Sequence, residues 1–144
     1  MTLVRLLLRQ PPQWLPPLIA GLLMVSALVG SLLPQMGPPG EYGIDKMVHV
    51  LGYAALAFAL GEIRGLRWPW ALILALVIGG GAELLQTAVP ERDGSWGDFF
   101  AGGLGAALGV AVQVALTQAR VQARTISAAG GKALPLSDES GKHP

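Results

Sequence analysis

The chain has 144 residues, of which 52% are hydrophobic and 13% charged, and its mean hydropathy is +0.52. An ordinary soluble domain has about 25% charged residues, so this composition indicates a membrane protein, of a length that suits one domain. The formal net charge of +1 provides no basic surface for nucleic acid. The absence of cysteine excludes disulfides and thiolate metal sites.

Four apolar segments are predicted to form transmembrane helices, because they lack strand alternation and approach the roughly 20 residues that cross a bilayer. The segments run from about Trp14 to Leu33, from about Lys46 to Gly61, from Trp68 to about Val89, and from Phe99 to Leu116. The second segment is short, so its polar end must reach the interface or the bilayer must thin. The predicted fold class is an all-α membrane protein with four transmembrane helices in a compact bundle.

The expected domain organisation is a cytoplasmic segment over 1–13, the transmembrane domain over 14–117 and a disordered cytoplasmic tail over 118–144. The first apolar segment has an alternative interpretation as a cleaved signal peptide, because arginines precede it and the small residues 25–27 lie inside it. The apolar run continues to Leu33, which favours a transmembrane helix.

The distribution of basic residues predicts that both termini are cytoplasmic. If four helices cross the membrane and the N-terminus is cytoplasmic, Lys46 and Arg92 are the only basic residues on the outer side. The basic residues on the inner side are then Arg5, Arg9, Arg64, Arg67, Arg120, Arg124, Lys132 and Lys142. The expected location is the bacterial inner membrane, with the lipid bilayer as partner.

Polar residues interrupt the apolar segments near their outer ends. An ionisable group at membrane depth costs about 2.5 to 3.5 kcal/mol, so these residues predict a functional site in the outer leaflet. They are Asp45, Lys46, His49, Tyr53, Glu83, Gln86 and Asp98.

Helical spacing places several of these residues on shared faces. Asp45, His49 and Tyr53 are four residues apart and form one stripe, while Glu83 and Gln86 are three apart on the third segment. A carboxylate at the depth of Glu83 must be protonated, paired or in contact with water. A structural hydrogen bond between His49 and Glu83 is the alternative to a functional site.

The remaining polar residues have structural alternatives of their own. Asp98 opens the fourth segment, where a carboxylate suits a helix N-terminus, and Lys46 can extend to the interface. Arg92, in the loop before Asp98, is a fixed positive charge that could pair with a carboxylate or receive an anionic head group. Gly105 and Gly109 predict close helix packing, within the monomer or in a homo-oligomer.

Several motifs follow one another in a fixed order: DKMVHVLGY at 45–53, AELLQ at 82–86, Arg92, and DFFAGGLGAALG at 98–109. In this order they resemble the VanZ-like family of integral membrane proteins. The resemblance covers roughly residues 30 to 112 and implies a role in the cell envelope without a defined reaction. This family usually has Asn where the chain has Gly102, so the chain either lacks a hydrogen-bonding site residue or packs more closely there.

The first functional hypothesis is an enzyme that acts on a lipid or lipid-linked substrate from the extracytoplasmic side, with His49, Glu83 and Asp98 as candidate catalytic residues. A divalent metal held by the same three residues is a variant of this hypothesis. Two alternatives remain open: a non-enzymatic module that binds a lipid, peptide or ion, and a structural helper whose polar residues form interhelical hydrogen bonds. The candidate substrate-binding residues are Asp45, Lys46, Tyr53, Gln86 and Arg92.

Overall fold

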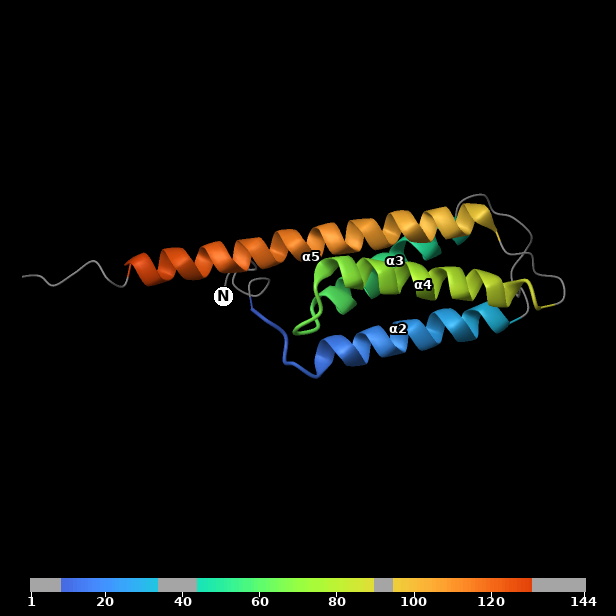
Figure 1. Ribbon diagram of the computed structural model, residues 1–144, viewed down its shortest axis with the longest axis horizontal. Helices are drawn as coiled ribbons and strands as arrows, with labels where there is room; N and C mark the ends of the chain where they lie inside the picture. The colour runs from blue at the N-terminus through green and yellow to red at the C-terminus, as the bar shows by residue number, and fades with distance from the viewer. Residues whose placement is uncertain (1–8, 34–43, 90–94, 131–144) are drawn as a thin grey trace, which may run out of the picture.

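The computed structural model describes residues 9–33, 44–89 and 95–130 and contains four α-helices over these ranges (Figure 1). The helices are α2 (Leu15–Leu32), α3 (Ile44–Gly61), α4 (Trp68–Gln86) and α5 (Trp96–Gly130). The all-helical prediction is confirmed. By length and composition, α2, α4 and α5 could each cross a membrane, whereas the described apolar part of α3 is shorter, at Lys46–Gly61.

Proline and glycine mark the helix boundaries. Both α2 and α4 begin with proline in their first turn, where the missing amide hydrogen would have no partner within the helix. The chain between α3 and α4 turns at Gly65, whose φ of +84° lies in the left-handed region that glycine adopts without steric cost. The predicted starts and ends of the first three helices agree with these boundaries to within about three residues.

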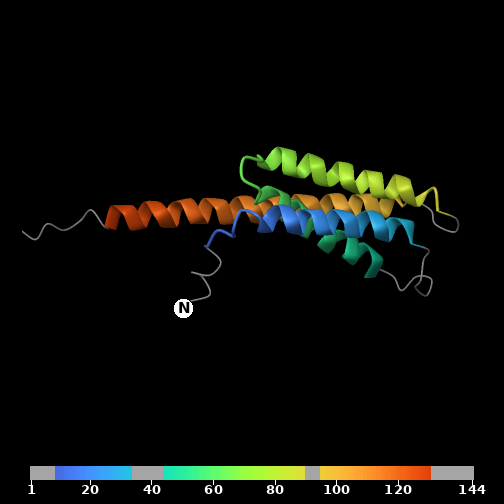
Figure 2. The ribbon, with the colours of Figure 1, turned by 90° about the horizontal axis from the view of Figure 1, so that it is seen from below.

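The middle helices α3 and α4 each pack against all three others, and within the described ranges α2 does not contact α5 (Figures 1 and 2). The most extensive contact joins α3 and α5. We call the end where α3 begins, α4 ends and α5 begins the site end, and the other the opposite end.

The interior is built mainly from small side chains, whereas many large apolar side chains point outward. Among the described residues, Leu56 is the largest fully buried apolar residue, and alanines such as Ala57, Ala71 and Ala106 belong to the same buried cluster. Exposed side chains include Val77 and Leu84 on the outer face of α4. Small residues at helix contacts with large apolar residues outside are typical of proteins whose surroundings are lipid.

Two glycines on α5 allow its backbone to touch that of α3. A Cβ atom added at Gly105 would overlap the carbonyl oxygen of Val50, and one added at Gly109 would overlap that of Ala54. The close packing predicted from these glycines therefore lies within the chain, between α3 and α5.

The fourth helix is longer than the sequence predicted. Disorder was expected from residue 118, and this expectation is wrong for 118–130, because α5 continues to Gly130. The physical reasons are the Ala, Gln and Arg content of this stretch, which favours helix, and the burial of Arg120 against Glu62. Figure 1 shows α5 continuing beyond the other helices at the opposite end.

Candidate functional site

Three ionisable side chains from three helices meet at the site end. His49 lies in the second turn of α3, Glu83 in the last turn of α4 and Asp98 in the first turn of α5. One potential ligand atom from each lies within 4.8 Å of the other two. The structure thus brings together the three residues that the sequence singled out as candidate catalytic groups.

The His49 and Glu83 side chains form a partly buried ion pair if the imidazole is protonated. His49 Nε2 lies 3.5 Å from Glu83 Oε1, and the two side chains are 16% and 12% exposed. The other carboxylate oxygen, Glu83 Oε2, accepts a hydrogen bond of 3.0 Å from the backbone N–H of Ser95. Glu83 is therefore held from α5 while one of its oxygens faces the imidazole.

Ser95 is a site residue that the sequence reasoning missed. It precedes α5, and the backbone N–H of Asp98 donates to both Ser95 O at 3.0 Å and Ser95 Oγ at 3.4 Å. The sequence did contain a signal for Ser95: a serine followed three residues later by an acidic residue, here Asp98, is the pattern of a helix N-terminus. Ser95 thus connects the start of α5 to Glu83.

Asp98 is buried and incompletely paired. Its side chain is 10% exposed, and within the described ranges Oδ1 has no hydrogen-bond partner. Among the described residues, Asp98 forms an ion pair with Lys46, whose Nζ lies 3.5 Å from Oδ1 and whose side chain is 58% exposed. A buried carboxylate oxygen without a hydrogen bond is costly, so this atom is poised to accept a further partner.

Tyr53 lies between the apolar core and the ionisable cluster. Its ring is buried and stacks on His49 with a centroid distance of 6.3 Å and an interplanar angle of 22°. A Cβ atom added at Gly102 would lie 2.8 Å from Tyr53 Cδ2. An asparagine at this position would therefore have to displace Tyr53, and Gly102 serves close packing here.

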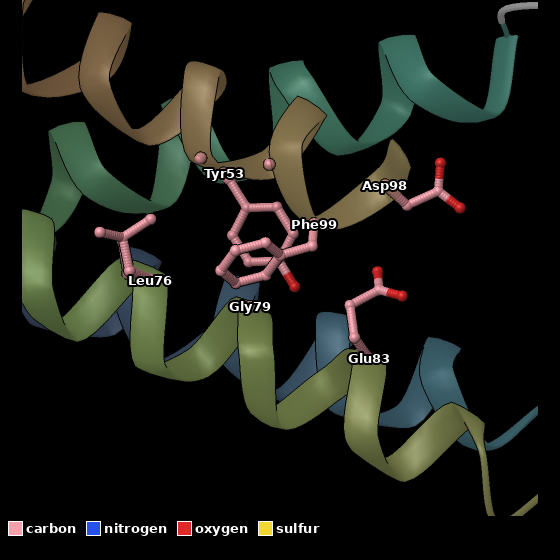
Figure 3. A pocket seen from close by; sticks show the side chains of 9 residues that line it. Tyr53, Leu76, Gly79, Glu83, Asp98 and Phe99 are labelled. Carbon is pink, nitrogen blue, oxygen red and sulfur yellow. The ribbon is translucent and has the colours of Figure 1, made fainter. Parts of the chain in front are cut away.

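A small cavity of about 10 Å³ adjoins the cluster (Figure 3). Figure 3 shows the Tyr53 hydroxyl pointing toward Glu83, with Asp98 at the same end of the cavity. The volume suits about one water molecule. The cavity is lined by Tyr53, Ala75, Leu76, Gly79, Glu83, Asp98, Phe99, Gly102 and Gly103.

The structure does not bring all predicted binding residues to this cluster. Gln86 is buried on α4 but does not line the cavity. Asp45 belongs to the first turn of α3, and its side chain lies outside the described residues, as does the whole of Arg92. Lys46 and Tyr53 are the predicted binding residues that contact the cluster.

Comparisons of the chain with protein-family models, with curated proteins and with solved structures found no match. The resemblance to VanZ-like proteins therefore remains a prediction from the residue pattern.

A second polar cluster, at the opposite end, was not predicted. Arg120 Nη1 donates to both carboxylate oxygens of Glu62, at 2.8 and 2.7 Å, and both side chains are buried. Gln113 Nε2 donates to Gly61 O at 2.9 Å and to Thr117 Oγ1 at 3.0 Å. The sequence signal was helical spacing, which places Gln113, Thr117 and Arg120 on one face. It was missed because the helix was predicted to end at Leu116, before Thr117 and Arg120.

The two polar clusters differ in what they can do. Arg120 of α5 pairs with Glu62, the residue after α3, which is a structural role, although Arg120 Nε is buried with no hydrogen-bond partner among the described residues. At the site end, Glu83 and Asp98 line a cavity and lie close to His49, and Asp98 Oδ1 has no hydrogen bond to any described residue. That arrangement can transfer protons or hold a divalent cation.

Proposed function

We propose that the chain is a multi-pass protein of the bacterial inner membrane, in which all four helices cross the bilayer as a compact bundle. Both termini lie in the cytoplasm, and the site end faces the outer leaflet. The support is the charge distribution: Arg9, Arg64, Arg67 and Arg124 belong to segments of the opposite end, and positive residues accumulate on the cytoplasmic side.

We further propose that the site end binds the anionic head group of a lipid or lipid-linked substrate of the cell envelope. The observation that carries this proposal is the meeting of His49, Glu83 and Asp98 from three helices within 4.8 Å. In the proposed orientation these groups lie at a depth where ionisable side chains are costly. Lys46 is the exposed cation beside this cluster and would contact a phosphate or carboxylate.

The chemistry that fits this geometry is proton transfer. Glu83 and His49 would act as base and acid, and the cavity beside Glu83 would hold one water molecule. A cavity of about 10 Å³ cannot enclose a head group, so the head group would lie outside it, near Lys46.

The test is native mass spectrometry of the protein extracted with its bound lipids, for the wild type and for Glu83→Gln. We expect the variant to lose most of its bound lipid while the free energy of unfolding changes by less than about 1 kcal/mol, because the amide oxygen can still accept from Ser95 N–H. A time-dependent change in the mass of the bound lipid, absent in the variant, distinguishes an enzyme from a binding module.

Glu62→Gln is the matched control, since it replaces a buried carboxylate at the opposite end. It should lower the free energy of unfolding by about 3 to 5 kcal/mol, because it leaves Arg120 buried without its counter-charge, while lipid retention persists in the folded protein. Unfolding of Glu83→Gln in detergent would instead support a structural helper. Unchanged lipid retention in Glu83→Gln would contradict the binding proposal.

A further inference from the structure

We infer that His49, Glu83 and Asp98 form a binding site for one divalent metal ion, of the class that includes Zn²⁺ and Mn²⁺. This inference rests on the proposed function only in placing the ion in the same outer-leaflet site, where it would face the head group. In the metal-bound protein His49 and Glu83 are ligands and do not act as acid and base. The binding of the ion can be measured without any lipid.

The separations of the ligand atoms suit such an ion. Zinc bonds to imidazole nitrogen and carboxylate oxygen are about 2.0 to 2.2 Å long, so neighbouring ligand atoms in a tetrahedral site lie about 3.3 to 3.6 Å apart. His49 Nε2 and Glu83 Oε1 already lie 3.5 Å apart. The third ligand atom, from Asp98, lies within 4.8 Å of both, so a side-chain adjustment of about 1 Å would close the site.

Asp98 provides an independent indication of a missing partner. Its side chain is nine-tenths buried, and Oδ1 has no hydrogen bond to any residue of the described ranges. The Lys46 ammonium, at 3.5 Å and mostly exposed, compensates this oxygen only partly. A directly bound cation would satisfy it.

The surroundings hold two of the three ligands in position. Glu83 Oε2 accepts from Ser95 N–H, which leaves Oε1 directed at His49. The imidazole is fixed by stacking on Tyr53. Contacts of this kind orient metal ligands and support affinity.

The donor set selects the class of ion. One nitrogen and two carboxylate oxygens, in a chain without cysteine, suit Zn²⁺ or Mn²⁺ and not Cu⁺ or iron–sulfur clusters. Calcium requires six to eight oxygen ligands, which the described residues do not supply here. Three protein ligands would leave one position of a tetrahedral ion open for water or substrate.

The experiment is calorimetric titration of tag-free, chelator-washed protein in detergent with Zn²⁺. We expect one ion per chain, and at least tenfold weaker binding in His49→Ala and Asp98→Asn. His143→Ala removes the only other histidine and is the matched control, which should bind as the wild type does. Absence of binding by the wild type, or wild-type affinity in both site variants, would overturn the inference.

Lys46→Met is a second measurement that remains informative if the site variants do not fold, because the Lys46 side chain is mostly exposed. Removing a positive charge beside Asp98 should raise the affinity for Zn²⁺ severalfold. Unchanged or weaker binding in Lys46→Met would show that the ion is held elsewhere and would overturn the inference.

Lipid retention measured on the same samples separates this inference from the proposed function. Zinc binding at His49 and Asp98 without retained lipid supports the metal site and contradicts the head-group proposal. Retained lipid that depends on Glu83, with no zinc binding, overturns the metal site and leaves the proposed function standing.

Discussion

Tyr53 is the residue through which packing in the core affects the polar site. Its ring stacks on His49 and lies against two glycines: a Cβ atom at Gly79 would come within 3.2 Å of it, and one at Gly102 within 2.8 Å. A side chain at either glycine would therefore change the position of the imidazole as well as the packing.

Gly102→Ala should destabilise the protein by about 1 to 3 kcal/mol, because the added methyl group overlaps the Tyr53 ring, which stacks on His49. Gly103→Ala is the matched control on the same helix, since a Cβ atom there lies 3.5 Å from Leu76 Cδ2, an ordinary contact. Thermal unfolding in detergent measures both. Equal stability of the two variants would show that Tyr53 has room to move.

Part of this residue-scale picture could be predicted from sequence. His49 and Glu83 were identifiable because an ionisable residue inside an apolar helix is rarely accidental. The buried, unbonded oxygen of Asp98 could not be predicted, because it depends on the separation of three helices and on the rotamers of Lys46 and Asp98. The contact from Ser95 to Glu83 likewise requires the relative positions of α4 and α5.

At the scale of elements, the contact between α3 and α5 depends on two glycines spaced one turn apart. The backbone carbonyls of Val50 and Ala54 occupy the space where side chains at Gly105 and Gly109 would lie. Unlike a side chain, a backbone carbonyl cannot rotate away, so the helices must separate to admit even a methyl group.

Gly105→Ala should therefore lower the melting temperature markedly, although alanine is intrinsically the better helix former by about 1 kcal/mol. Gly81→Ala on α4 is the control, because nothing lies within 4 Å of a Cβ atom there, and it should leave stability unchanged or raise it. A neutral Gly105→Ala would contradict the close approach of α3 and α5.

The helices themselves were largely predictable, because their apolar runs have the length of a bilayer crossing and carry proline or glycine at their ends. The end of α5 was not. Hydropathy falls after Leu116, which marks the end of the apolar segment but not the end of the helix. The residues from Gln118 to Ala129 have high helix propensity, so α5 continues through them. The buried partner of Arg120 is Glu62, the residue after α3 and 58 residues earlier, which a local pattern does not show.

At the scale of the whole molecule, the absence of cysteine makes the proposed orientation directly testable. Single cysteines introduced at Thr87, at the site end, and at Ser127, near the end of α5, both replace exposed residues. In intact spheroplasts, a membrane-impermeant maleimide should label Thr87→Cys and not Ser127→Cys, because the described arginines favour the cytoplasm for the opposite end.

Permeabilised cells provide the control for this labelling, since both variants should then react. Labelling of Ser127→Cys alone in intact spheroplasts would invert the proposed topology and place the ionisable cluster toward the cytoplasm. Labelling of both variants in intact spheroplasts would mean that the helices do not form four crossings.

The two ionic contacts of α5 with α3 restrict how the molecule could open. Lys46 pairs with Asp98 near one end and Glu62 with Arg120 near the other, 22 residues later along α5, a distance of about 33 Å. Sliding α5 by one turn would break both pairs and misalign the two glycine contacts at once. The α3–α5 pair is thus a fixed frame, and α4, which carries Glu83 and the opposite wall of the cavity, is the part whose displacement could admit a larger molecule.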